Sequence, residues 1–135
     1  MSINEKYLVK ISEYAEKHFI KSFSKRYKWA REETLKVIIE MLERIKIFSK
    51  ITDKAEKIHI CDKWYIVKCK FKIAWSNESP KTSWNRIIAY VNEESKEVLI
   101  LLIYTKTDIQ WGNETVWREK LIKENHKKIC ALFNF

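Results

Sequence analysis

The stretch NRIIAYVNEESKEVLILLIYTK, residues 85–106, decides the fold. Its two apolar runs, NRIIAYVN and EVLILLIYTK, are rich in the β-branched and aromatic residues that favour strands. The polar segment NEESKE lies between them. A short polar segment between two such runs is typical of a hairpin turn. The stretch therefore predicts two adjacent antiparallel strands.

A third strand precedes this hairpin, in WYIVKCKFKIAW, residues 64–75. Successive side chains of a strand point to opposite faces, so the apolar residues and the lysines separate. One face carries Tyr65, Val67, Cys69, Phe71 and Ile73, and the other carries Lys68, Lys70 and Lys72. The ammonium groups then follow one another at about 6 to 7 Å. This row of positive charge is the main functional signal in the sequence.

The N-terminal half predicts a short strand and two helices. KYLVKIS, residues 6–12, alternates as a strand does, and from Glu13 the apolar residues follow a helical stripe with Ser12 as its N-cap. A continuous helix from residue 4 is the alternative. A second helix is predicted over residues 31–48, where apolar residues recur at helical spacing. The segment ITDKAEK, residues 51–57, is interpreted as a polar connection.

The C-terminal segment is predicted to be helical from Asn113 onward, since Trp117, Leu121 and Ile122 begin an apolar stripe. The order is strand, helix, helix, three strands, helix. We therefore predict an α+β fold in which a small antiparallel sheet of about four strands packs on two N-terminal helices (βααβββ), with an extra C-terminal helix. The 135 residues are expected to form a single domain with a core at about residues 6–108 and an extension at 109–135.

The charge balance predicts an anionic partner. Lysine and arginine number 27 against 18 acidic residues, which gives a net charge of +9. Nucleic acid, an acidic protein and a charged membrane surface would all satisfy it. The start MSINEKYLVK lacks a signal-peptide pattern, and the longest uncharged apolar run, VLILLIYT, is too short for a bilayer span. A cytoplasmic location without membrane contact is expected.

Three passages, together with the order of elements, resemble the RelE/ParE superfamily of toxins from bacterial and archaeal toxin–antitoxin modules. They are YAEKHFIKSFSKRYKW leading to LKVIIEMLERI, then WYIVKCKFK, then NRIIAYVNEESKEVLILLIYTKTD. The last is the most specific, because an arginine opening one strand, an acidic turn and a strand ending in I-Y-x-K recur in that group. The resemblance covers about residues 6–108.

The resemblance implies a RelE-like mRNA interferase that inhibits translation, often on the ribosome, and is held inactive by a cognate antitoxin. RelE-like enzymes need no metal or other cofactor: the RNA 2'-hydroxyl attacks the adjacent phosphate and leaves a cyclic phosphate. Lys68 and Lys70 match the family's Lys-x-Lys strand, Arg86 matches the arginine near the start of the next strand, and Lys106 matches the basic residue that ends the last one. These four are the predicted catalytic residues.

The residue chemistry agrees with these roles. In-line cleavage needs a base, positive charge for the phosphate oxygens, and an acid for the leaving oxygen. Neighbouring cations and partial burial favour the neutral amine of a lysine, while arginine stays charged and suits a bidentate phosphate clamp. Lys72 supplies a third basic position of the row, and Tyr104 and Trp111 are the predicted RNA-binding aromatic residues.

Two other functions stay open. ParE-like proteins share this fold and inhibit DNA gyrase without nuclease chemistry, and a basic RNA-binding module would use the same lysines for phosphate contacts alone. The lysines could also be no more than the solvated face of a strand. The sequence departs from well-known ribosome-dependent members in having Thr107 where they carry an arginine, and no tyrosine after Tyr104.

Overall fold

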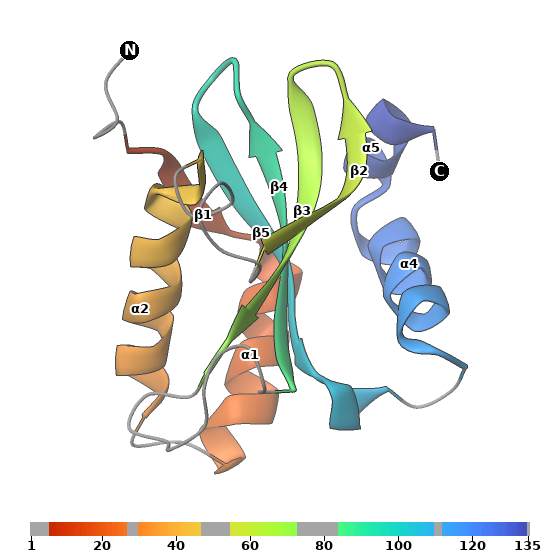
Figure 1. Cartoon of the computed structure of the whole chain (residues 1–135). Helices are drawn as coiled ribbons and strands as arrows, with labels where there is room; N and C mark the ends of the chain where they lie inside the picture. Colours follow the sequence, from red (N-terminus) through yellow and green to blue (C-terminus); the bar gives the residue numbers. More distant parts are fainter. Residues whose placement is uncertain (1–5, 27–29, 47–54, 73–83, 110–111, 135) are drawn as a thin grey trace.

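The computed structural model describes residues 6–26, 30–46, 55–72, 84–109 and 112–134, with the backbone alone for residues 20–26. Its elements are β1 (Leu8–Ile11), α1 (Glu13–Arg26), α2 (Arg31–Glu43), β2 (Ala55–Cys61), β3 (Trp64–Phe71), β4 (Asn85–Asn92), β5 (Glu97–Thr105), α4 (Glu114–Asn125) and α5 (Lys127–Phe133). Figure 1 shows α1 and α2 to one side of the sheet and α4 and α5 to the other. In this part of the chain, no helix is both long and apolar enough to cross a membrane.

The described strands form one mixed sheet in the order β1-β5-β4-β3-β2. The predicted hairpin is confirmed, because β4 and β5 pair in antiparallel register from Asn85 opposite Thr105 to Asn92 opposite Glu97. β3 pairs antiparallel with β4, whereas β1 pairs parallel with β5. The α+β class is confirmed, and the sheet differs from the expected antiparallel one in this edge strand. Alternation within KYLVKIS predicts a strand but not its direction.

β2 is a strand that the sequence analysis assigns in part to a polar connection. It pairs antiparallel with β3 at the edge of the sheet, and Glu56 and Lys57 are exposed. The register shifts between Lys57 and His59, so the segment lacks a regular period of two. Edge strands are commonly charged and bulged, which protects them from pairing with other chains. These same features removed the alternation by which a strand is recognised in sequence.

The helix starts follow the sequence more closely than the helix ends. The Ala15 amide donates to Ser12 Oγ at 3.1 Å, which confirms the predicted cap, and the strand β1 excludes the continuous helix from residue 4. The predicted helix at residues 31–48 is interrupted, because α2 ends at Glu43 and Arg44 has φ −118° and ψ 33°. The rest of that range beyond residue 46 lies outside the described residues. The single C-terminal helix is divided at His126, whose φ of −138° is not helical.

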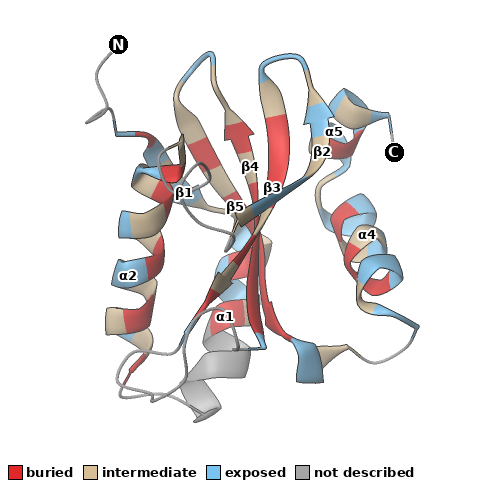
Figure 2. Cartoon of the chain, viewed as in Figure 1, coloured by how far each residue is buried: buried red, intermediate tan, exposed pale blue. Residues whose placement is uncertain are grey.

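Each face of the sheet is covered by a layer of helices, and buried positions follow both faces (Figure 2). On the α1–α2 side, Phe19, Ile38 and Leu42 pack against the β3 residues Val67 and Cys69. This confirms the predicted apolar face of β3 as far as Phe71; Ile73 lies outside the described residues. Burial raises the pKa of the Cys69 thiol to about 12, so this cysteine is an inert apolar residue.

The second face carries a separate apolar cluster beneath α4 and α5. It consists of Ile66, Ile88, Leu101, Leu102, Tyr104, Trp117, Ile122 and Cys130. Fully burying one large aliphatic side chain stabilises a fold by about 1.5 to 3 kcal/mol, so this cluster contributes substantially to holding the C-terminal helices on the sheet. Trp117, the first residue of the predicted apolar stripe, is only 6% exposed, so the stripe packs into the core as expected.

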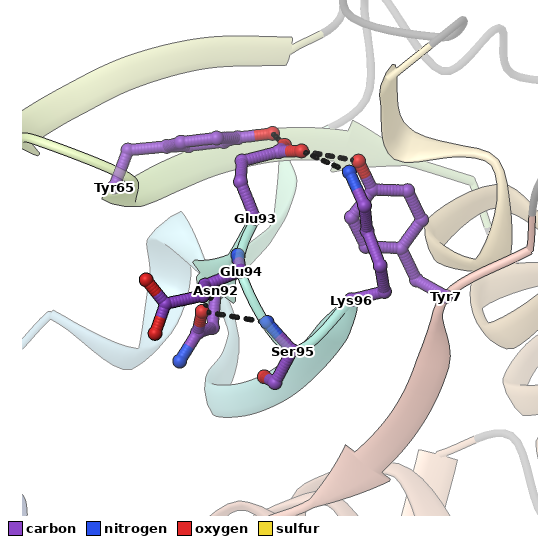
Figure 3. Close-up of polar contacts among 7 residues, drawn as sticks. All are labelled: Tyr7, Tyr65, Asn92, Glu93, Glu94, Ser95 and Lys96. Atoms are coloured by element: carbon purple, nitrogen blue, oxygen red, sulfur yellow. Dashed lines mark hydrogen bonds and ion pairs between the residues drawn. The ribbon is translucent and has the colours of Figure 1, made fainter. Parts of the chain in front are cut away.

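The acidic turn of the hairpin is fixed by hydrogen bonds rather than by glycine. The Asn92 side chain accepts from the amides of Glu94 and Ser95, and Lys96 takes a left-handed φ of 58°. Figure 3 shows the Glu93 carboxylate between Tyr65 on one side and Tyr7 and Lys96 on the other. It accepts from the hydroxyls of Tyr7 and Tyr65 at 2.5 and 2.9 Å, and Lys96 lies 3.3 Å from it. The turn thereby joins the start of β1 to β3.

Candidate nucleic-acid site

The register of the sheet places three of the predicted site residues in one row. Lys70 on β3 lies opposite Arg86 on β4, and Arg86 lies opposite Tyr104 on β5. Residues directly opposite each other project from the same face of an antiparallel pair. The row therefore lies on the face that α4 and α5 cover, at the end of the sheet where β3 finishes and β4 begins.

Lys68 and Lys106 extend the positive charge to either side of this row. Lys68 is two positions before Lys70, and its side chain is 21% exposed and 3.7 Å from Glu56 on β2. Lys106 directly follows β5 in a 3-10 turn, Lys106–Asp108, and its amide donates to the Trp84 carbonyl at 3.0 Å. Asp108 holds that turn by accepting from the Thr105 amide. The four predicted catalytic residues thus come together from two strands, β3 and β4, and the turn that follows β5.

The three predicted RNA-binding residues differ in how far they are accessible to an RNA. Lys72 is exposed just after β3, while Tyr104 is buried, with 1% of its surface exposed. Trp111 lies outside the described residues. Trp84 is 59% exposed at the start of β4. Its backbone contact with Lys106 places this tryptophan at the edge of the cationic cluster, where an exposed indole is suited to stacking on a base.

Arg86 is only 5% exposed, and its Nη1 donates to the Asn85 carbonyl at 2.9 Å. A buried guanidinium stays protonated, so it is a fixed positive charge. Its neighbour Tyr104 donates to Glu114 Oε2 at 2.7 Å. Burial and the Glu114 hydrogen bond raise the pKa of Tyr104, which keeps the phenol protonated and therefore a donor. Neither side chain is set up to accept a proton at neutral pH.

Two residues of this site, Glu114 and Arg118, were not found by sequence reasoning. Both come from α4: the Glu114 carboxylate enters the cluster beside Lys106 at 3.9 Å, and the positive charge of Arg118 acts on Tyr104. Arg118 is 5% exposed, and its Nε has no hydrogen-bond partner among the described residues. Sequence analysis used Glu114 only as a helix-start signal. The folding of α4 across the sheet thus brings an arginine, Arg118, into the site.

Cations outnumber carboxylates in this site. The carboxylates are Glu114 and the more exposed Glu56. The cations are the two lysines of β3, Arg86, Lys106 and Arg118. Among the described residues, no group of three or more His, Cys, Asp or Glu side chains is arranged to hold a metal ion. A cluster of lysines and arginines on a partly apolar surface with an exposed indole beside it can bind a phosphodiester and an adjoining base.

Comparison with known proteins assigns the fold. No family model matches the sequence, and no curated protein matches it. Solved structures do resemble the chain, among them two of RelE toxins. The fold is therefore that of the RelE toxins, as the resemblance in the sequence implies.

The first of these is the archaeal RelE–RelB complex from Pyrococcus horikoshii OT3, with 18% identity and a TM-score of 0.51, over 74% of this chain and 94% of that chain. The second is the E. coli toxin RelE, carrying two arginine-to-alanine substitutions, in the free state. It is 21% identical with a TM-score of 0.51, over 92% of this chain and 98% of that chain. At these identities, the comparison speaks for the fold alone.

Proposed function

We propose that this protein is the toxin of a toxin–antitoxin module and that it cleaves messenger RNA, at the ribosome, without a metal ion. The observation that carries the proposal is the convergence of Lys68, Lys70, Arg86 and Lys106 on one face of a RelE-like sheet. The P. horikoshii neighbour was solved with RelB, which supports a cognate antitoxin as partner here. A chain with net charge +9 suits both an RNA and an acidic antitoxin segment.

The proposed reaction is an internal displacement at phosphorus. One of the β3 lysines accepts the proton of the 2'-hydroxyl, and the 2'-oxygen forms a bond to phosphorus while the bond to the 5'-oxygen breaks. Arg86 stabilises the charge on the non-bridging oxygens, and Lys106 donates a proton to the departing 5'-oxygen. The products are a cyclic phosphate and a 5'-hydroxyl. Positioned acid–base groups and fixed cations each contribute about 10²-fold or more to such a step.

The test compares cleavage of a labelled message, free and on programmed ribosomes, by the wild type and by the double variant Lys68→Ala, Lys70→Ala. A matched control, Lys17→Ala with Lys63→Ala, removes the same charge from exposed positions on α1 and the β2–β3 turn. We expect the first variant to lose about 10²-fold or more in rate and the control to cleave as the wild type does. Arg86→Gln should behave like the first variant while remaining folded by circular dichroism.

If both double variants lost the same factor in cleavage rate, the net charge of the protein rather than the cationic site would determine cleavage. That result would contradict the proposal. The same preparations should be tested for inhibition of DNA gyrase supercoiling. Gyrase inhibition without RNA cleavage would assign the ParE-like alternative. If the wild type binds RNA in a salt-sensitive way but does not cleave it, the protein is instead a basic RNA-binding module without catalytic activity.

A further inference from the structure

The face that carries the cations is covered by helix α4 of the protein itself. Trp117 of α4 packs edge-on against Tyr104 with the ring centroids 5.1 Å apart, and Ile122 is fully buried in the same cluster. Tyr104 is the cross-strand neighbour of Arg86, and only 5% of Arg86 is exposed. The helix therefore lies where a phosphate would have to approach this guanidinium.

The first residue of this helix brings a negative charge to the cations. Glu114 Oε2 accepts the Tyr104 hydroxyl at 2.7 Å, and Oε1 lies 3.9 Å from Lys106 Nζ. The charges of Lys68 and Arg86 also act on this carboxylate. One carboxylate thus interacts with three of the four residues expected to bind the scissile phosphate.

The position of Glu114 is fixed by local structure and by packing. Asn113 caps α4 by accepting from the Val116 amide at 2.9 Å, which sets the first turn and directs Glu114. One turn further along, Glu119 Oε1 lies 2.7 Å from His59 Nε2 on the edge strand β2. The buried Trp117 and Ile122 and this contact between Glu119 and His59 hold the helix in place whether or not Glu114 is charged. The Glu114 carboxylate can therefore be changed without removing the helix's main anchors.

The electrostatic surroundings of Glu114 suit the role of a counter-ion better than that of a proton acceptor. Burial by itself raises the pKa of Glu114, but the Tyr104 hydrogen bond and the charges of Lys68, Lys106 and Arg86 outweigh it, and the pKa lies below its ordinary value. A carboxylate stabilised in this way is a weak base. It remains negative at neutral pH, as a phosphodiester does.

We propose that Glu114 is an internal competitor for the RNA phosphate: its carboxylate occupies the cationic site of the free protein and must leave before RNA binds. This inference rests on the proposed function and adds an autoinhibitory contact to it. RNA that displaces Glu114 exchanges one anion for another on the same cations. Part of its binding energy is spent on that exchange, so the free protein binds and cleaves RNA less well than the site alone would.

The test uses Glu114→Gln in the full chain, which removes the charge and keeps the shape, with Glu124→Gln as the matched control. Glu124 lies on the same helix with a side chain 54% exposed and paired with Lys120. Binding of inorganic phosphate and of a single-stranded RNA would be titrated, and the cleavage rate measured. Removing one charge-assisted contact corresponds to about tenfold in affinity, so Glu114→Gln should bind both ligands about tenfold more tightly and cleave subsaturating RNA faster. The control should match the wild type.

The outcomes separate this inference from the proposed function. Tighter binding of both phosphate and RNA by Glu114→Gln, with no cleavage of RNA by any of the proteins, would support the competitor role of Glu114 and overturn the nuclease activity. If Glu114→Gln binds phosphate and RNA with the affinities of the wild type, and the wild type cleaves RNA, then the competitor role of Glu114 is wrong and the proposed nuclease activity stands. Tighter binding with a cleavage rate reduced about 10²-fold would overturn the competitor role as well, because Glu114 would then be required as a proton acceptor.

Discussion

Lys70 and Arg86 are direct cross-strand neighbours on β3 and β4, so two cations stand side by side on one face of the sheet. Like charges at such positions destabilise a sheet by a fraction of a kcal/mol. On the other face, the residues that flank them, Cys69 and Ile87, are fully buried. The site is thus a local cost in stability that the core on the opposite face offsets.

Replacing Lys70 by threonine should therefore stabilise the fold while weakening RNA binding. We expect the free energy of unfolding to rise by about 0.5 kcal/mol at low ionic strength, with a smaller gain in high salt, where the repulsion is screened. Urea denaturation at two salt concentrations measures this. Lys10→Thr is the control, because it removes a strand lysine that pairs with Glu97 at 3.4 Å and should bring no gain. A stability loss in Lys70→Thr would show that the repulsion is not significant.

Trp84 should contribute a base-stacking contact. It is 59% exposed beside Lys106, so removing its side chain takes little from the core. Stacking on an aromatic side chain is worth about 1 to 3 kcal/mol per base, so Trp84→Ala should weaken binding of single-stranded RNA by about fivefold or more, and Trp84→Phe by less. Fluorescence anisotropy measures the affinities. Ile60→Ala, at an exposed apolar residue of β2, should leave the affinity as it is; equal losses in both would contradict the stacking role.

Glu93 should make stability depend on pH in the acid range. Burial raises the pKa of Glu93, but hydrogen bonds from Tyr7, Tyr65 and Lys96 outweigh this, and the pKa falls below its ordinary value of 4.5. The folded state therefore binds the proton less readily than the unfolded state does. The stabilisation is present above pH 4.5 and is lost as the pH falls through the lowered folded-state pKa.

Thermal unfolding of wild type and Glu93→Gln between pH 3 and pH 7 tests this. The variant should be less stable at pH 7, and the two curves should converge as the pH falls below about 4.5. Glu94→Gln, at an exposed neighbour in the same turn, should follow the wild type throughout. If the difference in thermal stability between the wild type and Glu93→Gln were constant from pH 3 to pH 7, the effect would come from the shape of the side chain rather than from its charge.

The sequence predicted what depends on local periodicity and missed what depends on how elements meet. The hairpin and the two faces of β3 follow from alternation within a few residues, and so the row of Lys70 with Arg86 could be anticipated. β2 was missed because its bulge and charges remove that alternation. Glu114 is near Tyr104 only because α4 folds back across the sheet, a placement that no local pattern encodes.

His126 provides the last prediction, at a higher pH. Its Nε2 lies 2.9 Å from the Leu101 carbonyl, and burial lowers the pKa of His126 below 6.5 although this hydrogen bond raises it. The unfolded state binds the proton more readily, so this stabilisation is present above pH 6.5 and decreases as the pH falls below it. Because His126 joins α4 to α5, acidification should loosen these helices first. His126→Gln keeps a donor for Leu101, and its stability should fall less than that of the wild type between pH 7 and pH 5. Parallel denaturation curves over this interval would contradict the prediction.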